Sequence, residues 1–471
     1  MAEKQQFDVG TAVDDAPWSS YQKRVLGLLA LLFAMDGLAN QSLGIALPAL
    51  IADWGVARSA FAPVAALNLA GVAIGTVVGG MLGDRFGRRI GVILAILLFG
   101  IMTAAGAFVQ NIEMLMAVRF LDGLGIGAAV PNGAALITEF TPLRRRSRGI
   151  AIGMVFIPIG GIIAGAAGAS VLPHWGWRTL FLVAGSLPIM LALIFAKTLP
   201  ESPRILARDP KRQGQLVALM GRMGISAPAG AQFAANAEDA HHARAPLSAL
   251  FGRGRWRDTL LLWTGFFTCL LASYTIFSWV PTMLSSMDFS LTLASTGITA
   301  FHMGGVIGCL TCGLLIDRFG SRWSHIGMCG GGSIVAVLLA VTVQNADLQI
   351  LTFALIMVEG FFVAGLHNSL YTLAANLYGP DARATGIGSA SAFGRLGAVL
   401  SSYTGVHSLE MFGTTGFFVT VAITLGLCMI SGGAIRRQVV GEARPIRPAS
   451  GNGPAVPPGT GTTCSASGTA D

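Results

Sequence analysis

Long apolar stretches alternate with short polar connections along almost the whole chain. Each stretch holds about 20 residues, enough for a helix to cross a hydrocarbon core of about 30 Å. The first six are expected at 24–46, 60–82, 90–109, 112–134, 149–171 and 178–197, and the second six at 259–284, 293–316, 324–343, 348–370, 384–407 and 411–434. The pattern therefore predicts an all-α integral membrane protein with twelve transmembrane helices.

Polar segments divide this chain into two bundles of six helices each. We expect a short N-terminal segment at 1–23, a first bundle at 24–197, a loosely structured linker at 198–258 and a second bundle at 259–434. The tail at 435–471 is rich in Pro, Gly, Ser and Thr, a composition typical of disorder. The first 23 residues are polar and lead straight into a full-length span, so no cleavable signal peptide is expected.

Composition and charge support this interpretation. Hydrophobic residues make up 53% of the chain and charged residues 11%, whereas a soluble domain carries roughly 25% charged residues. The net charge of +8 could suggest nucleic acid, but the basic residues gather in alternate connections, and the other connections hold only Arg58 and Arg178. By the positive-inside rule both termini are expected in the cytoplasm, so the protein should lie in a bacterial inner membrane and bind no nucleic acid.

Sequence signatures of enzymes and of metal sites are missing from the chain. We find no clustered His or Cys ligands, no G-x-S-x-G elbow and no phosphate-binding G-x-x-x-x-G-K loop. Cys309 and Cys312 form a C-x-x-C inside an apolar span, where small packing residues are the favoured interpretation. We expect no catalytic residues, no metal, no cofactor and no obligate protein partner.

A repeated motif links the two halves. Residues 80–89 read GMLGDRFGRR after the second span, and residues 313–322 read GLLIDRFGSR after the eighth. Both fit G-x-x-x-D-R-F-G-x-R, and span four adds the R-x-x-x-G-x-G-x-G of residues 119–127. These motifs resemble the major facilitator superfamily, whose two halves rock around a central site. The resemblance implies gating roles for Gly80, Asp84, Arg85, Arg88, Asp317, Arg318, Arg322 and Arg383.

Further local stretches resemble the aromatic acid:proton symporter family of that superfamily. They are GIGAAVPN at 125–132, LPES at 199–202, WVPT at 279–282, RATG at 383–386 and GRLG at 394–397. The resemblance implies proton-coupled import of a benzoate-like carboxylate, with Asn132 as a binding candidate. The family has Asp-Gly-aromatic-Asp in span one, whereas this chain has Asp36-Gly37-Leu38-Ala39 and so lacks the second carboxylate.

Five ionisable residues are expected near the middle of spans: Asp36, Arg119, Asp122, Glu359 and Arg395. Each costs roughly 2.5–3.5 kcal/mol in lipid, so all should face the protein interior. Counting about 1.5 Å per residue puts Asp36, Arg119 and Asp122 at similar depths. We therefore expect one proton-coupling network, in which Asp122 supplies the carboxylate missing at Ala39.

Arg395 is the candidate for gripping a substrate carboxylate, with Glu359 as its resting counter-ion. His302, a residue type that can titrate near neutral pH, is a further binding candidate. Tyr274 and Trp263 are candidates because they fall with Phe267 and Phe277 near one helical face, for which ordinary packing is the favoured interpretation. The expected partners are an aromatic carboxylate, protons and the lipid bilayer. Export of amphipathic drugs, uptake of another organic acid or sugar, a membrane enzyme and a non-transporting sensor remain as alternatives.

Overall fold

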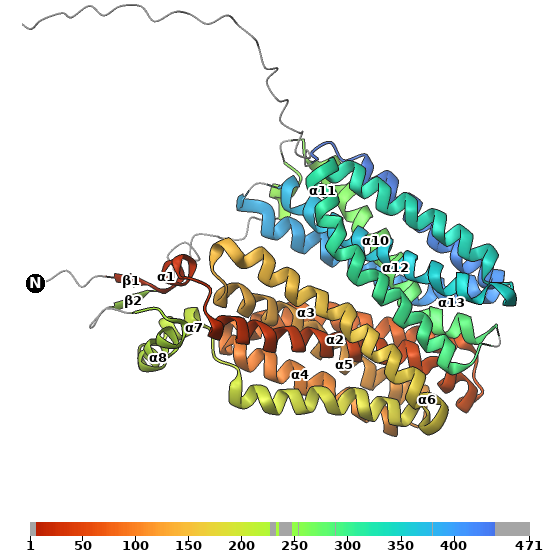
Figure 1. Ribbon diagram of the computed structural model, residues 1–471, viewed down its shortest axis with the longest axis horizontal. Coiled ribbons are helices and arrows are strands. Elements are labelled where there is room, and N and C mark those ends of the chain that lie inside the picture. The colour runs from red at the N-terminus through yellow and green to blue at the C-terminus, as the bar shows by residue number, and fades with distance from the viewer. Residues whose placement is uncertain are drawn as a thin grey trace, which may run out of the picture.

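The computed structural model describes residues 6–226, 232–234, 247–252, 254–287, 289–378 and 380–438. Helices dominate it (Figure 1). The first half contains α2 (Ser20–Trp54), α3 (Ala62–Phe86), α4 (Arg88–Ala105), α5 (Ile112–Phe140) and α6 (Arg146–Thr198). The second half contains α10 (Trp256–Ser285), α11 (Leu291–Thr342), α12 (Gln349–Leu377) and α13 (Pro380–Gly433). The expected all-helical bundle is thereby confirmed.

Nine segments of the described chain are long and apolar enough to cross a membrane. The helices α6, α11 and α13 hold 53, 52 and 54 residues. Each contains one non-helical glycine: Gly176, Gly320 and Gly413. Gly320 has φ 79° and ψ 166°, a backbone region that is essentially restricted to glycine. Gly87, which holds the same place in the first motif as Gly320 in the second, also has a positive φ of 116°. The motif repeat is thus also a repeat of backbone geometry.

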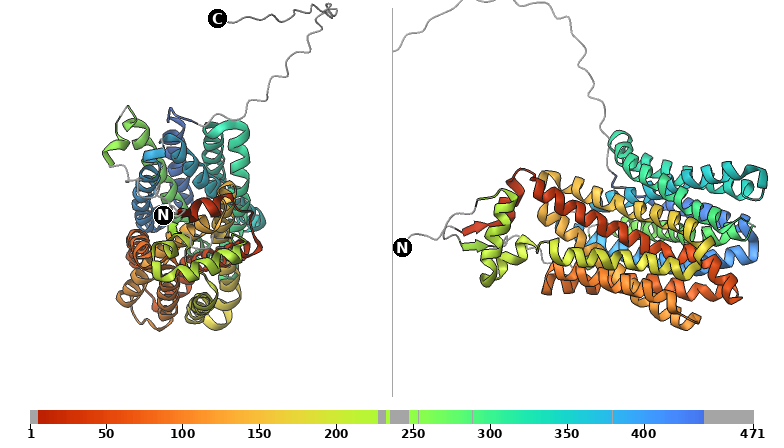
Figure 2. Two further views of the ribbon diagram at one scale, coloured as in Figure 1. Left: turned by 90° about the vertical axis from the view of Figure 1, so that its left-hand side faces the viewer. Right: turned by 60° about the horizontal axis from the view of Figure 1, so that its bottom comes forward.

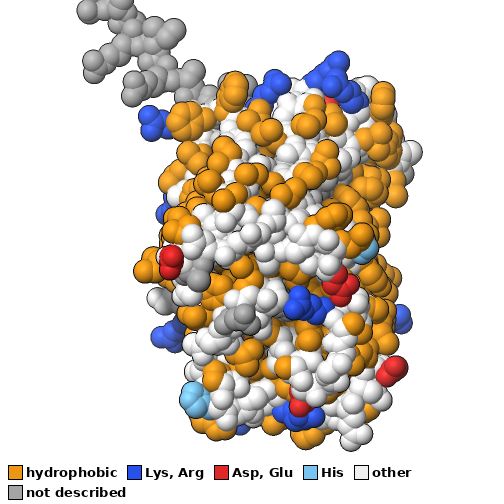
Figure 3. Space-filling view, turned by 90° about the vertical axis from the view of Figure 1, so that its right-hand side faces the viewer, with side chains coloured by type: hydrophobic (Ala, Val, Ile, Leu, Met, Phe, Trp, Pro, Cys, Tyr) orange, Lys and Arg blue, Asp and Glu red, His pale blue; other side chains and the backbone are white. Residues whose placement is uncertain are grey.

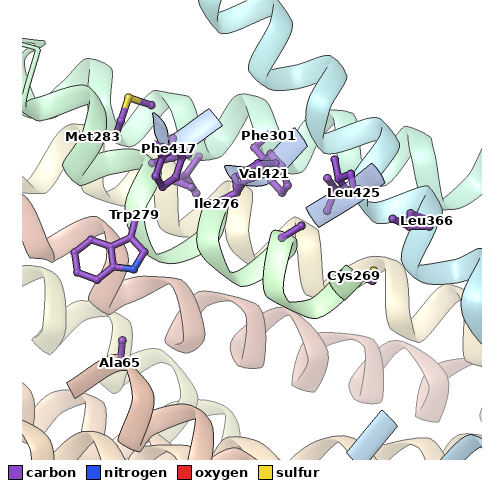
Figure 4. Close-up of a cluster of buried hydrophobic side chains, with 14 of the residues drawn as sticks. Ala65, Cys269, Ile276, Trp279, Met283, Phe301, Leu366, Phe417, Val421 and Leu425 are labelled. Carbon is purple, nitrogen blue, oxygen red and sulfur yellow. The ribbon is translucent and has the colours of Figure 1, made fainter. Parts of the chain in front are cut away.

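Each half packs mainly within itself. In the first half α3 packs on α5 and α2 on α6; in the second α11 packs on α12 and α10 on α13. The halves meet where α11 contacts α6, α13 contacts α3 and α10 contacts α2. Trp279 of α10 and Ala65 of α3 belong to one buried apolar cluster that crosses this boundary (Figure 4).

Many large hydrophobic side chains are exposed on the outside of the bundle. Val77, Met81, Leu94 and Val341 are among those more than half exposed. Figure 3, which looks onto one end of the bundle, shows hydrophobic side chains there among other residues. Polar side chains such as Arg119, Asp122 and Glu359 are buried instead. This inverted distribution is the one that a lipid environment requires.

A small assembly extends the bundle at one end (Figures 1 and 2). It consists of α1 (Val9–Asp15), α7 (Pro203–Arg208), α8 (Gln213–Met223) and a parallel pair of short strands, β1 (Gln6–Asp8) and β2 (Gln232–Ala234). The first part of the linker is therefore helical, not loosely structured, because α8 buries Leu216, Leu219 and Met220. His241 and His242 of the linker, and the tail from residue 439, lie outside the described residues.

Candidate functional site

A buried ion pair lies inside the first half. Asp122 accepts a hydrogen bond from Arg119 Nη1 at 2.9 Å, and the two side chains are 0% and 1% exposed. They stand three residues apart on α5, so they share one helix face. Thr103 Oγ1 donates to Asp122 Oδ1 at 2.9 Å. Asn68 Nδ2 donates at 3.3 Å to Oδ2, the oxygen that Arg119 also binds. The carboxylate is thus held by three donors from three helices.

Arg119 also reaches α2 at the position where the family's second carboxylate is missing. Its Nη1 lies 3.3 Å from Ser42 Oγ, and Ser42 in turn donates to the carbonyl of Ala39 at 2.7 Å. The guanidinium carbon lies 4.5 Å from the centre of the Phe181 ring, a cation–π contact that stabilises a desolvated charge. Arg119 Nε and Nη2 have no hydrogen-bond partner.

Asp36 is buried close to this pair but does not join its hydrogen bonds. Its Oδ1 has no partner, and the charged groups that act on it are Arg395 and Asp122. The expected network of Asp36, Arg119 and Asp122 is therefore present as one direct pair with a separate carboxyl nearby. Counting residues along the helices predicted that Asp36 lies near Arg119 and Asp122. It did not predict that Arg395 of the second half acts on Asp36.

Arg395 of α13 is half-buried at the boundary between the halves. Within the described residues it forms neither an ion pair nor a hydrogen bond, although it acts electrostatically on Asp36 and on His367 of α12. Its donors are therefore available to a ligand.

Glu359 is not the counter-ion of Arg395, which corrects the sequence-based expectation. Neither of its carboxyl oxygens has a partner, and it is 1% exposed. Its Oε1 lies 3.8 Å from the point where a Cβ on Gly332 would stand. Glu359 thus points from α12 toward Gly332 of α11, inside the second half.

The boundary carries a small polar cavity. Gln41 Nε2 of α2 lies 2.7 Å from His302 Nε2 of α11 and hydrogen-bonds it across the halves. The His302 ring lies 5.4 Å from Phe277, which in turn contacts Tyr274 edge-on at 5.4 Å. Beside them a cavity of about 30 Å³ is lined by Asn40, Gln41, Asn68, Tyr274 and Phe277 together with apolar neighbours. That volume holds about two water molecules, so this part of the boundary is nearly closed.

Trp263 lies apart from Tyr274 and does not contact the cavity. Its ring stacks on Phe393 of α13 at 5.3 Å and meets Phe251 edge-on at 5.7 Å. Phe267 also contacts Phe393, at 5.9 Å. The predicted aromatic face of α10 is thus mostly a packing face against α13.

Asn132 of α5 packs against the first motif. It accepts a hydrogen bond from Arg88 Nη1 at 3.2 Å and donates to the carbonyls of Gly79 and Ala128 at 2.8 and 2.9 Å. A Cβ on Gly83 would stand 1.7 Å from its Oδ1. Both polar atoms of the Asn132 side chain are thus engaged where α5 meets the first motif.

The two motif loops differ in their contacts. In the first, Arg88 pairs with Asp84, and Glu201 accepts the backbone N–H of Arg89 at 3.1 Å. In both, the arginine after the aspartate stacks on the following phenylalanine: Arg85 on Phe86 at 5.4 Å and Arg318 on Phe319 at 5.3 Å. Gly80 has open space around its Cα, and Asp317, Arg318, Arg322 and Arg383 are exposed.

Three hydrogen bonds join the halves in the described part of the chain. Besides Gln41 and His302, Ser59 N donates to Glu410 Oε1 at 3.1 Å and Thr292 Oγ1 donates to the carbonyl of Ala169 at 3.2 Å. Ser59 lies between α2 and α3, Glu410 lies three residues before the non-helical Gly413, and Ala169 lies seven residues before the non-helical Gly176. The first motif lies at the other end of α3. The halves are therefore fastened together at the end of the bundle opposite the motif loops.

Comparison with known proteins now places this architecture. The family model described as Major Facilitator Superfamily matches residues 29–345 and 290–458. Among solved structures, the D-xylose–proton symporter has a TM-score of 0.67 at 18% identity and covers 89% of this chain and 98% of its own. A bacterial homologue of the human lysosomal transporter Spinster, in an inward-facing and unoccupied conformation, has a TM-score of 0.67 at 15% identity, covering 88% and 96%. The fold is that of a multi-pass membrane transporter.

Curated relatives narrow the family. The gallate transporter of Pseudomonas putida is 32% identical over 86% of this chain and 89% of its own length. The 4-hydroxybenzoate transporter of Pseudomonas aeruginosa is 31% identical over 93% and 97%, and the benzoate transport protein of Acinetobacter baylyi is 28% identical over 84% and 85%. The chain belongs to the aromatic acid transporter family of the major facilitator superfamily. It is a transporter of the cytoplasmic membrane and not an enzyme.

Proposed function

We propose that this protein imports an aromatic carboxylate together with protons, by alternating access. The relatives named for gallate, 4-hydroxybenzoate and benzoate support the substrate class. The observation that carries the proposal is the half-buried guanidinium of Arg395, which lies between the halves with its donors unoccupied in the described structure. Burying such a charge in a span is costly unless a partner arrives, and a carboxylate is the partner that fits it.

The proposed topology has twelve spans and cytoplasmic termini. The non-helical glycine near the middle of α6, α11 and α13 supports the division of each into two spans, because a continuous 52-residue helix would be about 78 Å long. The basic motif loops and the linker then share one side, as the positive-inside rule requires.

In this proposal Arg395 binds the substrate carboxylate with two parallel hydrogen bonds. His367, which interacts electrostatically with Arg395, is placed to recognise a ring substituent. His367 was not among the residues selected from the sequence, where it belongs to none of the recognised motifs.

Asp36 is the proposed proton carrier of the cycle. It is buried, one of its oxygens has no partner, and Arg395 acts on it from the other half. Substrate binding neutralises Arg395 and so favours the neutral form of Asp36. Importing an anion against an interior-negative potential costs about 2.3 kcal/mol per 100 mV, and one proton carried with it cancels that charge.

Alternating access is supported by the one-sided contacts between the halves. The hydrogen bonds from Ser59 to Glu410 and from Thr292 to Ala169 close the end opposite the motif loops. Opening that end must break these contacts and form new ones at the motif loops. The protein therefore occupies the state that is closed on the outer side.

The test is uptake of radiolabelled 4-hydroxybenzoate, gallate and benzoate into liposomes that contain the purified protein, with and without an imposed inward proton gradient. We expect accumulation that a protonophore abolishes. A gradient that drives efflux, or no transport of any of these acids, would overturn the proposal in favour of an exporter or of another substrate.

Two variants separate binding from coupling. Arg395→Lys should raise KM by about 10- to 100-fold, because charge-assisted hydrogen bonds contribute about 1.5–3 kcal/mol. Asp36→Asn should keep exchange of substrate across the membrane but lose accumulation driven by protons. Arg178→Ala, which removes a 54% exposed guanidinium paired with Asp53, is the control and should leave both unchanged. Wild-type KM in Arg395→Lys would rule out direct contact with the carboxylate.

A further inference from the structure

A second polar cluster lies inside the second half, away from Arg395. His325 and Cys329 of α11 and Cys428 of α13 are all buried, and their ligand atoms lie within 4.8 Å of one another. His325 and Cys329 stand one helical turn apart, with Nε2 and Sγ separated by 3.6 Å. The transport proposal does not use these residues.

The contacts of His325 are compatible with the tautomer that binds a metal. Ser369 Oγ lies 2.8 Å from the carbonyl oxygen of Leu366 and 3.0 Å from His325 Nδ1. When the hydroxyl donates to Leu366, it accepts from His325 Nδ1–H, and Nε2 is then an acceptor. In that tautomer Nε2 lies 3.1 Å from the carbonyl oxygen of Cys428 and 3.6 Å from Cys329 Sγ. A cation beside Nε2 would satisfy both the ring nitrogen and the carbonyl.

The His325 ring packs directly against the backbone of Gly432. A Cβ on Gly432 would stand 2.0 Å from His325 Nε2, so only glycine at that position admits the ring. The contact joins α11 to the last turns of α13, near the motif end of the bundle. Leu425, one turn before Cys428 on α13, belongs to the same buried apolar cluster as Cys329 and Cys428.

We propose that His325, Cys329 and Cys428 form a binding site for a thiophilic d¹⁰ cation such as Zn²⁺. Three atoms within 4.8 Å of one another lie at most about 2.8 Å from a common point, so small shifts reach the zinc bond lengths of about 2.0–2.3 Å. Thiolate and imidazole are the donors that select such ions. The carbonyl of Cys428 is placed to be a fourth ligand.

Binding of Zn²⁺ to this cluster would leave the net charge of the buried site unchanged. Zn²⁺ binds as two thiols each lose a proton, so two protons leave for each ion that enters, and the net charge inside the bundle does not change. His325 Nε2 ligates the metal while Nδ1–H continues to donate to Ser369, an outer contact that orients the ring. The bound ion would tie α11 to α13 within the second half.

The experiment is titration of the full-length protein, reduced and purified in detergent, with ZnCl₂. Bound zinc is measured after desalting, and released protons are measured with a pH indicator. We expect one ion per chain and two protons per ion. Co²⁺ in place of Zn²⁺ should give thiolate-to-metal charge-transfer absorption.

Three single variants, His325→Ala, Cys329→Ala and Cys428→Ala, should each weaken zinc affinity at least about tenfold and abolish the cobalt absorption. Cys309→Ala removes a thiol outside the cluster and should retain both. Thermal unfolding without metal establishes that each variant is folded, and zinc should raise the Tm only of wild type and Cys309→Ala. Zinc binding of wild type no stronger than that of a Cys329→Ala/Cys428→Ala variant, or an equal loss in Cys309→Ala, would overturn the proposal.

Discussion

Replacing Asp122 with alanine tests whether the ion pair with Arg119 stabilises the first half. The change removes hydrogen bonds from Arg119, Thr103 and Asn68 and leaves a guanidinium that is 1% exposed without its counter-ion. Breaking one partner of a buried pair costs about 3–5 kcal/mol. Asp84 and Arg88 form a pair on the same half in which the aspartate is 53% exposed, and such pairs contribute about 0–1 kcal/mol.

The measurement is thermal unfolding of the detergent-purified variants. Asp122→Ala should lower the Tm by several times the change in Asp84→Ala. A double variant, Arg119→Leu with Asp122→Leu, removes both charges and should recover most of the lost stability, because the isolated charge causes the loss. Uptake should remain low in the double variant if the pair also serves coupling.

Two results would refute this reasoning. One is an Asp122→Ala protein no less stable than Asp84→Ala, which would show that water or lipid headgroups reach Arg119. The other is a double variant as unstable as the single one, which would show that lost packing, and not an unpaired charge, is the cause.

Four further substitutions test close packing, backbone geometry and the side-chain hydrogen bonds of Asn132. A Cβ at Gly304 would stand 1.7 Å from the carbonyl oxygen of Met357. Gly304→Ala should therefore force α11 and α12 apart and lower the free energy of unfolding by about 1–3 kcal/mol. The control is Gly313→Ala on α11, where an added Cβ meets open space; it should leave the free energy of unfolding unchanged or raise it by about 0.5–1 kcal/mol. Gly320→Ala, at a φ of 79°, should cost about 1–3 kcal/mol, and a Tm equal to that of Gly313→Ala would contradict the strain argument. Asn132→Ala should lower the maximal rate of uptake and the Tm while KM changes less than about twofold, since its side chain bonds Arg88 of the first motif and Gly79 just before it. A raised KM at an unchanged rate would instead indicate that Asn132 contacts the substrate.

The fold was largely predictable because its determinants are local in sequence. A span is recognised from some 20 consecutive residues, and the two copies of the D-R-F-G motif mark corresponding places in the halves. The small assembly of β1, β2, α7 and α8 was not predicted, since β1 and β2 are three residues each and pair across more than 200 positions. Short strands have no periodicity from which a sequence can reveal them.

The depth of the candidate site residues in the membrane was predictable from the sequence, but the direction in which their side chains point was not. Counting residues along helices correctly brought Arg119 to the level of Ala39, where Ser42 links them. The same counting could not tell that Glu359 points into α11 and Arg395 toward Asp36, because a helix turns about 100° per residue and small errors in its rotation change every partner. The zinc-site candidate shows the limit most clearly: His325 and Cys428 are 103 positions apart and meet only because Gly432 leaves room for the ring. The partners of polar groups inside the membrane therefore depend on how each helix is rotated and how closely the helices pack. Small residues such as Gly432 determine that packing, and neither hydropathy nor motif comparison takes them into account.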